Sequence, residues 1–597
     1  MRKYSCKILL AVLITIQVIY TAYAFANWKE GLHSDEVWSY GFSNSHYRPF
    51  LALRDGIGIL WYDDEDVINC EEWVSGEELR KYITVQEGER FAYDSVYYNN
   101  ANDLHPPLFY MLLHTVCSFF PEKFSPWYGE SLNLLFLAVT QVFLFLTIHK
   151  ITKSEVTALA GCLLYGGSRG ALLTFTFIRQ YSMVLALCMM FVYFSACFYD
   201  SLIQKGQFSR KYAIFAAVTA WLSFLTHYHG IVFIGTFTAC FCLYLLIRRK
   251  IGPMLFYGFS MLIALGCAFA VYPVAVEHFL GNWQATETSY SPLVQFKYLF
   301  NLLFRYDYGF GINYFPTAFW NITLPLLAAG IVVVGALLFP FRNEAWFPKL
   351  IIWLKDKVRE LLDWLKNANY VPLFTVTAGI VVYGIVANSV DVLLMGAYVF
   401  RYISIAVPYF AMAVVILLQV LLHKIPKMKR WSEAAIYLII GAVLIRVNVT
   451  IGYPYIYPQI TGNVDLVSET AGKKVLVVDR ITMSFITNIT WFSQWLYRAD
   501  SVCFTSRMTI EDTFGGGGGL DGRDADYMIV DTEVFRPSDA EKRELEARGG
   551  VTFGPEDGNP HVYAYTDGLK QITGNRDYEI LTIQVGQRGT YYVLKFE

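Results

Sequence analysis

The sequence predicts a polytopic membrane protein that is mainly α-helical, with a small α/β domain at its C-terminal end. Of its 597 residues, 55% are hydrophobic and only 16% are charged, whereas soluble proteins carry about 25% charged residues. The hydrophobic residues form long runs up to about residue 452, after which the chain becomes polar. The formal net charge of −2 excludes a strongly basic nucleic-acid binder.

About eleven hydrophobic runs are long enough to cross a bilayer, which takes about 20 residues per helix. They lie at 8–26, 131–149, 155–176, 180–199, 211–227, 229–247, 253–272, 317–340, 371–388, 402–422 and 432–451. A twelfth run, PPLFYMLLHTVCSFFP, is short, carries His114 and is bounded by prolines. If it does not cross, the basic clusters of the later loops share the cytoplasmic side with Arg2, Lys3 and Lys7, as the positive-inside rule requires. We therefore expect a cytoplasmic N-terminus and place the twelfth run in the outer interface.

Two other segments bear on the topology. The first 26 residues fit either a cleaved signal peptide or an uncleaved span. The apolar run continues to Phe25, which favours the span, and both interpretations place residue 27 onward outside the cytoplasm. Residues 349–366 repeat apolar side chains at helical spacing with lysines between them, which predicts a helix lying on the cytoplasmic surface.

The predicted domains are a transmembrane domain at 1–452, with a long outer loop and interfacial helices at 27–130, and an extracytoplasmic α/β domain at 453–597. In the latter, KKVLVVD, DYMIVD, HVYAYT and GTYYVLKF are typical of strands, and ITNITWFSQWLYR and PSDAEKRELEARGG of helices. The five glycines at 515–519 precede a strand rather than a helix, which favours a flexible loop over a phosphate-binding loop. The sequence leaves open whether Cys70 and Cys503 pair.

In this topology, polar residues at the ends of the spans collect on the outer side of the membrane. They are Asp35, Glu36, Asp103, His105, Arg179, Tyr181, His227, His229, Arg401 and Tyr402. An arginine or carboxylate inside the bilayer costs about 2.5–3.5 kcal/mol on insertion scales, so such residues usually line a cavity. Each also has an ordinary structural interpretation, because arginines at span ends often reach the lipid headgroups and the other residues fit loop ends.

An outer cavity with a carboxylate and arginines suits the attack of a hydroxyl on a sugar linked to a lipid phosphate. The acceptor hydroxyl needs a base, which a carboxylate supplies. The leaving phosphate needs cationic stabilisation rather than a proton. One carboxylate is then enough, whereas hydrolysis of an ordinary glycosidic bond generally uses two carboxyl groups.

The order of the motifs resembles the GT-C superfamily of membrane glycosyltransferases. They are a first span followed by DE, HPPLFY, R-x-Y at an outer helix start, a THY turn and a late RY-x5-P. More narrowly, the chain is similar to the bacterial branch related to dolichyl-phosphate-mannose protein mannosyltransferases and to the aminoarabinose lipid A transferase. The resemblance covers roughly 1–452 and implies a polyprenyl-phosphate donor and inversion at the anomeric carbon.

The resemblance also implies roles for the outer polar residues. It matches Asp35 to the catalytic carboxylate of the first outer loop, with Glu36 beside it as a second catalytic candidate. It matches Arg401 and Arg179 to basic residues near the lipid phosphate. The predicted substrate-binding set is Arg179, Tyr181, Arg401, Tyr402, His227, His105 and Asp103.

The expected partners are a polyprenyl-phosphate sugar donor, membrane lipids, and an acceptor protein, lipid glycan or wall polymer. No cofactor is expected, since this branch typically uses no metal, although a divalent cation at Asp35 with Asp103 or at the carboxylates of 63–66 stays an alternative. A transporter or lipid flippase is the competing class, and an envelope scaffold is another. Transporters tend to show internal repeats and sites at the bilayer midplane, whereas this sequence shows no repeat and has its polar residues at the outer rim.

Overall fold

The computed structural model separates the chain into two compact units. It describes residues 2–29, 31–54, 67–69, 72–282, 301, 319–344, 346–365, 371–387, 401, 404–423, 432–451, 465–479, 485–506, 524–531, 576–585 and 590–597. The membrane unit comprises Met1–Trp28, Leu104–Phe109 and Gly129–Ile456, and the sheet unit comprises Lys29–Asp103, Tyr110–Tyr128 and Tyr457–Glu597.

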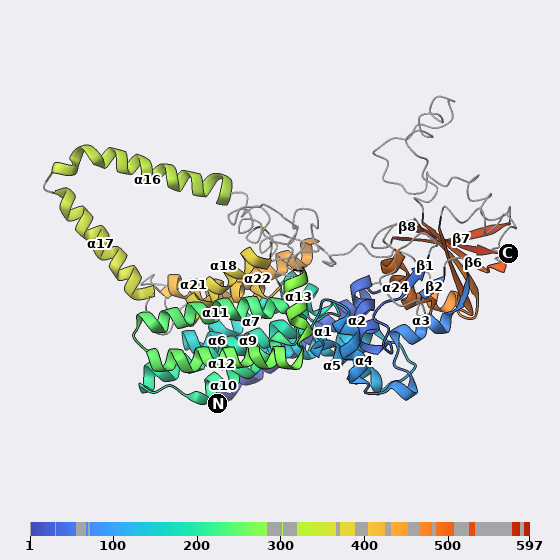
Figure 1. The fold of residues 1–597 in the computed structure, drawn as a ribbon. Coiled ribbons are helices and arrows are strands. Elements are labelled where there is room, and N and C mark those ends of the chain that lie inside the picture. Colours follow the sequence, from blue (N-terminus) through green and yellow to red (C-terminus); the bar gives the residue numbers. More distant parts are fainter. Residues whose placement is uncertain are drawn as a thin grey trace, which may run out of the picture. The chain divides into compact units, whose positions relative to one another are not determined.

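Among the described residues, seven helices of the membrane unit are long and apolar enough to cross a bilayer. They are α1 (Arg2–Asn27), α6 (Pro126–Thr152), α9 (Tyr181–Lys205), α11 (Tyr228–Ile247), α12 (Ile251–Val271), α16 (Leu324–Leu338) with the π-helical turn before it, and α21 (Ala406–His423). Each lies at a position where the sequence predicts a span. The predicted mainly α-helical, multi-pass architecture is therefore confirmed (Figure 1).

The predicted span at 155–176 is a broken pair of helices. α7 (Glu155–Gly166) and α8 (Arg169–Phe175) meet at an angle of 65°. The break occurs because Ser168 begins a new helix: its hydroxyl accepts a hydrogen bond from the Ala171 N–H at 3.2 Å. Together the two helices provide an eighth candidate span.

Helices also form at the three remaining predicted spans, as α10 (Arg210–Phe224), α18 (Val371–Ala387) and α22 (Ser432–Ile451). At 15 residues, α10 is about 22 Å long, which is shorter than the roughly 30 Å hydrocarbon core, so its crossing stays a prediction. The twelfth run forms α5 (Leu108–Ser118), whose 11 residues are too few to span. The predicted amphipathic helix is present as α17 (Trp346–Leu365), and α13 (Val274–Asn282) follows α12.

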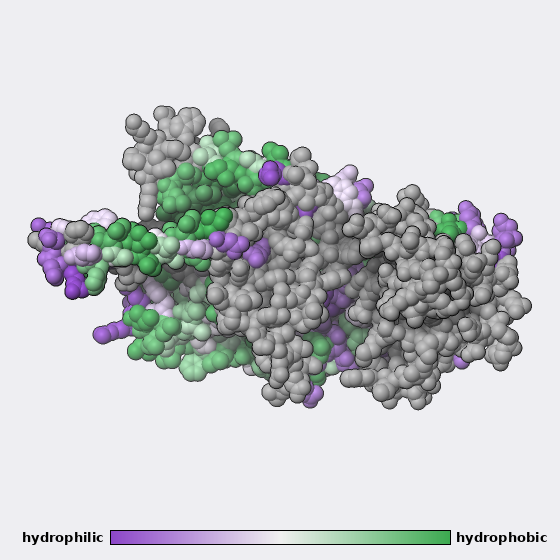
Figure 2. All heavy atoms as spheres, turned by 90° about the horizontal axis from the view of Figure 1, so that it is seen from above, coloured by the Kyte–Doolittle hydropathy of each residue, from purple (hydrophilic) through white to green (hydrophobic). Residues whose placement is uncertain are grey.

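The membrane unit packs around α9, of whose apolar window 83% is buried, compared with 22% for α12 and none for α16. Large hydrophobic side chains cover the outside of the unit, and Ile331 and Leu438 are each 74% exposed. Figure 2 shows such hydrophobic surface over much of the described helical part. An apolar exterior of this extent fits lipid rather than water as its surroundings.

The sheet unit is built on six strands. They are β3 (Trp73–Ser75), β4 (Lys474–Asp479), β5 (Ser501–Ser506), β6 (Tyr527–Asp531), β7 (Tyr578–Val585) and β8 (Thr590–Phe596), in the order β3-β5-β4-β6-β8-β7. Helix α24 (Phe485–Leu496) connects the parallel pair β4 and β5. The central strands β4 and β6 have the near-continuous apolar sequences of parallel strands covered on both faces. The predicted strands KKVLVVD, DYMIVD and GTYYVLKF and the predicted helix ITNITWFSQWLYR are therefore confirmed as β4, β6, β8 and α24.

Strand β3 comes from the segment between α1 and α6 and pairs antiparallel with β5, with Trp73 opposite Cys503. Helix α3 (Gly76–Ile83) follows it, and a side chain at Gly76 would meet the Ala499 carbonyl at 2.3 Å, so only glycine allows this approach. The sheet therefore combines sequence segments that the predicted boundary at 452 separates. The segment between α1 and α6 also forms α2 (Ser34–Asn44), α4 (Tyr93–Ala101) and a parallel pair of short strands, β1 (Ala52–Arg54) and β2 (Val67–Asn69).

Several predicted features lie outside the described residues. They are PSDAEKRELEARGG, HVYAYT, the glycines at 515–519, the carboxylates at 63–66, Cys70 and Tyr402.

Candidate active site

The first turn of α2 carries the two acids predicted to be catalytic. His33 caps this helix, because its Nδ1 accepts a hydrogen bond from the Asp35 N–H at 3.1 Å. A histidine nitrogen that accepts carries no proton, so the ring proton of His33 is on Nε2. The Asp35 Oδ1 lies 3.8 Å from the same Nδ1, and the Asp35 side chain keeps 12% of its surface exposed. The positive end of the helix dipole stabilises the charged carboxylate.

Glu36 is held in place by the same turn. One carboxylate oxygen accepts a hydrogen bond from the His33 N–H at 2.8 Å, which completes a capping box. The other oxygen pairs with the Lys29 ammonium, and both side chains are almost completely buried. The two adjacent acids therefore differ: Glu36 fixes the helix start and is fully buried, whereas the Asp35 side chain keeps part of its surface exposed.

Helix α24 fixes the backbone just before these acids. The Leu32 N–H donates to the Gln494 Oε1 at 2.7 Å, and the Leu32 carbonyl accepts from the Gln494 Nε2 at 3.0 Å and from the Trp491 Nε1 at 3.1 Å. A further bond joins the Trp38 Nε1 to the Thr490 hydroxyl at 3.1 Å. The segment carrying Asp35 is thereby tied to the α/β fold of the sheet unit.

A second group of predicted residues assembles in the membrane unit around His227. This histidine caps α11, and its Nδ1 accepts from the His229 N–H at 3.0 Å. The rings of His229, Tyr181 and His105 lie with their centroids 4.6, 5.3 and 6.0 Å from that of His227. The His227 ring, at the start of α11, thus lies next to residues from the start of α9 and from the chain before α5.

The surroundings of His227 are cationic. Burial lowers the pKa of His227 well below its usual range, and the charges of His229, His105, Arg179 and Arg401 lower it further. His227 is therefore neutral at neutral pH, while two arginines act on the same position. A buried place with concentrated positive charge is suited to an anion.

Arg179 is placed by a buried polar network that the sequence analysis missed. Its N–H donates to the Phe177 carbonyl at 2.8 Å, and that carbonyl also accepts from the Asn133 amide at 3.1 Å. The Asn133 side chain contacts Glu130 at 3.2 Å and accepts from the Ser182 hydroxyl at 2.6 Å. The signal was present, since glutamate and asparagine three residues apart in an apolar span mark one polar helix face.

The predicted site residues thus fall into two groups. The structure brings together His105, Arg179, Tyr181, His227 and Arg401 in the membrane unit. The acids Asp35 and Glu36 share the start of α2 in the sheet unit. Asp103 follows α4 in the sheet unit, with its N–H bonded to the Asn100 carbonyl at 3.2 Å. Within the part of the chain that the structure describes, no three histidine, cysteine, aspartate or glutamate residues form a group that could hold a metal ion.

No protein-family model and no curated protein sequence matches this chain. Several solved structures are similar to it. ArnT from Cupriavidus metallidurans bound to undecaprenyl phosphate is 10% identical with a TM-score of 0.41, covering 98% of this chain and 97% of that chain. The archaeal oligosaccharyltransferase AglB from Archaeoglobus fulgidus, in complex with an inhibitory peptide and a dolichol-phosphate, is 10% identical with a TM-score of 0.41, covering 88% and 70%.

The S. cerevisiae protein O-mannosyltransferase Pmt1–Pmt2 complex bound to the sugar donor is 15% identical with a TM-score of 0.30, covering 48% of this chain and 36% of that chain. The chain therefore spans about a third of the length of that relative. All three are GT-C glycosyltransferases, the superfamily that the sequence motifs resemble. At TM-scores below 0.5 these similarities carry no weight for the chemistry, which depends on this chain's own residues.

Proposed function

We propose that the chain is an integral membrane glycosyltransferase that transfers a sugar, with inversion, from a polyprenyl-phosphate donor to an extracytoplasmic acceptor hydroxyl. The observation that carries the proposal is the cationic centre at His227, buried at the ends of apolar helices. A phosphate on a long lipid combines the two properties that such a place accepts, a negative charge and an apolar chain.

In the proposed reaction, Arg179 and Arg401 stabilise the phosphate that leaves the anomeric carbon. Arginine suits this role, because its planar guanidinium binds phosphate oxygens through two parallel hydrogen bonds. Neutral His227 supplies a hydrogen bond without adding to the positive charge. Removal of water strengthens each of these interactions.

Asp35 is the proposed general base. The acceptor oxygen forms a bond to the anomeric carbon, its proton passes to the Asp35 carboxylate, and the bond from the anomeric carbon to the phosphate oxygen breaks. The polyprenyl phosphate departs with the electron pair of that bond. One carboxylate suffices because a phosphate leaves without protonation. We assign Glu36 a positioning role through its contacts with Lys29 and the His33 backbone.

The proposal has three further parts. The substrate is also bound by Tyr181, His105, Asp103 and Tyr402. The N-terminus is cytoplasmic and the sheet unit extracytoplasmic, and the transfer requires no metal. The positive-inside pattern of the loops supports the orientation. The contacts of His227 with Tyr181 and His105 support their place at the donor phosphate.

The test is binding of undecaprenyl phosphate to the purified chain in nanodiscs, measured by native mass spectrometry. We expect Arg401→Ala and Arg179→Ala each to weaken binding by about 10- to 100-fold, as for the loss of a charge-assisted hydrogen bond. Arg248→Ala is the matched control, because Arg248 follows the other end of α11, about 30 Å along the helix from His227.

Equal losses in the control and in the two site variants would show nonspecific attraction and contradict the proposal. Turnover separates an enzyme from a flippase: a chain that moves polyprenyl-phosphate sugar across a vesicle bilayer, forms no glycosylated acceptor and is unaffected by Asp35→Asn is a transporter.

A further inference from the structure

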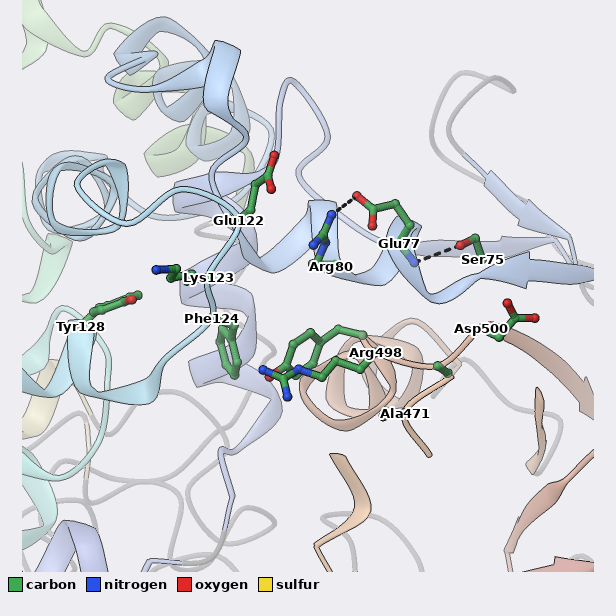
Figure 3. Close-up of a pocket in the computed structure, with 12 residues that line it drawn as sticks. Ser75, Glu77, Arg80, Glu122, Lys123, Phe124, Tyr128, Ala471, Arg498 and Asp500 are labelled. Carbon is green, nitrogen blue, oxygen red and sulfur yellow. Dashed lines mark hydrogen bonds and ion pairs between the residues drawn. The ribbon is translucent and has the colours of Figure 1, made fainter. Parts of the chain in front are cut away.

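The sheet unit contains a cavity that the proposed chemistry does not use. Its volume is about 730 Å³, which lies within the range of roughly 300–1,000 Å³ typical of ligand sites. Figure 3 shows Glu122, Arg80 and Glu77 along one side, with Phe124 and Arg498 along the other. The walls come from the segment between α1 and the start of α6 and from residues before and after α24 in the sequence.

The cavity has balanced charge. Three acids (Glu77, Glu122, Asp500) and three bases (Arg80, Lys123, Arg498) line it. A balanced lining does not select a strongly charged ligand. It offers carboxylate acceptors and cationic donors side by side, which suits a ligand whose groups both donate and accept hydrogen bonds, as sugar hydroxyls do.

Aromatic rings provide the other part of a saccharide site. The rings of Phe124 and Tyr497 lie 5.7 Å apart in an edge-to-face arrangement, and the Arg498 guanidinium lies over the Tyr497 ring at 5.5 Å. Tyr128 lies at another part of the lining and stacks on Phe120 at 4.9 Å. Ring faces and edges pack against apolar C–H groups, and the tyrosine hydroxyls add a polar contact.

The cavity is built on the elements that hold Asp35. Tyr40 of α2 packs against Phe124 at 5.1 Å, and its hydroxyl donates to the Ser125 carbonyl at 3.0 Å. Beside Phe124, Tyr497 and Arg498 directly follow α24, whose Gln494 binds the Leu32 backbone. Tyr40 is five residues, or about 7.5 Å along the helix, from Asp35. A ligand bound in the cavity is therefore held in a fixed position relative to the segment that carries Asp35, the candidate base.

We infer that this cavity binds a neutral oligosaccharide, and, resting on the proposed function, that this saccharide is part of the acceptor glycan. The aromatic contacts and the balanced hydrogen-bonding groups hold one portion of the glycan, and another portion provides the hydroxyl that reacts. The acceptor class is then a glycan rather than a polypeptide.

Binding is tested separately from turnover, by saturation-transfer NMR on the full chain in detergent. The probes are mannotetraose, maltotetraose and cellotetraose, with a serine-containing tetrapeptide as the alternative ligand. We expect at least one tetrasaccharide to bind wild type and the Asp35→Asn variant equally. The binding should weaken about tenfold in Arg498→Ala and in Asp500→Ala, each of which removes charged hydrogen-bonding partners.

Both substituted side chains are exposed, so their loss leaves the fold intact. Arg90→Ala is the matched control: Arg90 is also a partly exposed arginine of the sheet unit, and it pairs with Glu87 at 3.1 Å outside the cavity lining. Equal weakening in Arg90→Ala, or binding of the tetrapeptide in place of every tetrasaccharide, overturns the inference.

The two proposals fail in different ways. If transfer is observed but no tetrasaccharide binds, the saccharide site is wrong and the transferase stands. If a tetrasaccharide binds and Arg498→Ala removes the binding while no transfer and no polyprenyl-phosphate binding occur, the transferase is wrong and the saccharide site stands.

Discussion

The contact between Gln494 and Leu32 leads to a quantitative prediction about the segment that carries Asp35. Gln494 is 5% exposed and Leu32 is 3% exposed. The glutamine both accepts from the Leu32 N–H, at 2.7 Å, and donates to its carbonyl, at 3.0 Å. In Gln494→Leu, a side chain of similar size occupies the same space and forms neither bond.

The expected effect follows from these two bonds. The Leu32 carbonyl still accepts a hydrogen bond from the Trp491 Nε1. Removal of its bond to Gln494 therefore costs as much as one ordinary hydrogen bond, about 0.5–1.5 kcal/mol. The Leu32 N–H is left buried with its acceptor removed, which costs about 1–3 kcal/mol. Together the opening free energy of this segment should fall by roughly 1.5–4.5 kcal/mol, which corresponds to an equilibrium constant for local opening that is about 10- to 1,600-fold larger.

Hydrogen exchange measured by mass spectrometry on peptides covering 30–40 gives this quantity directly, in the full chain. Gln86→Leu is the matched control, because the side-chain amide of Gln86, in the same unit, donates to the nearby Thr84 at 3.0 and 3.3 Å and forms no hydrogen bond to the 30–40 segment among the described residues. Exchange in this region that is unchanged in Gln494→Leu, or equally accelerated in Gln86→Leu, would refute the reasoning. Transfer activity should fall together with protection, mainly in kcat, since Asp35 is then less well positioned.

Three further predictions concern the acids, the histidine and metal. Asp35→Asn should insert normally and lose transfer activity by about 10²–10⁴-fold, and full turnover in this variant would exclude the base. Glu36→Gln should instead lower the free energy of unfolding, by about 3–5 kcal/mol, because it removes the negative charge of a buried ion pair with Lys29. The pKa of His227 is lowered in the folded state. As the pH falls below about 6.5, the unfolded chain therefore binds a proton at His227 before the folded chain does. The contribution of His227 to stability is complete above that pH and decreases on acidification. The thermal midpoint should thus fall more between pH 7.5 and pH 5 in wild type than in His227→Asn, which keeps a capping acceptor, and equal pH dependence would contradict this. Removal of divalent metal with EDTA should leave transfer unchanged, because arginines meet the phosphate charge, and a loss that Mg²⁺ or Mn²⁺ restores would show otherwise.

Much of the fold could be predicted because each membrane-spanning helix needs a long apolar run, and such runs are visible in the sequence. The apolar runs that became α1, α6, α9 and α11 are set by bilayer thickness. The buried strands β4 and β6 are likewise visible as short apolar runs. What sequence patterns do not contain is the pairing of distant segments, so the place of β3 beside β5 was not predicted.

The candidate site was predicted in part for the same reason. Polar residues at the ends of apolar helices stand out against their surroundings, and this identified Arg179, His227 and Arg401. The difference between Asp35 and Glu36 was not visible, because it depends on the hydrogen bonds of one helix turn and on Lys29.

By itself, the sequence determined that this protein crosses the membrane many times and which residues are out of place in lipid, because composition and periodicity reflect the solvent around each segment. Only the tertiary structure decided that Glu36 is buried and paired with Lys29, that Arg179 and Arg401 lie near His227, and that α24 binds Leu32. It also decided that the segment between α1 and α6 adds a strand to the sheet and lines the cavity. These depend on contacts between residues far apart in the chain, whose energies come from burial and geometry and leave no periodic pattern in the sequence.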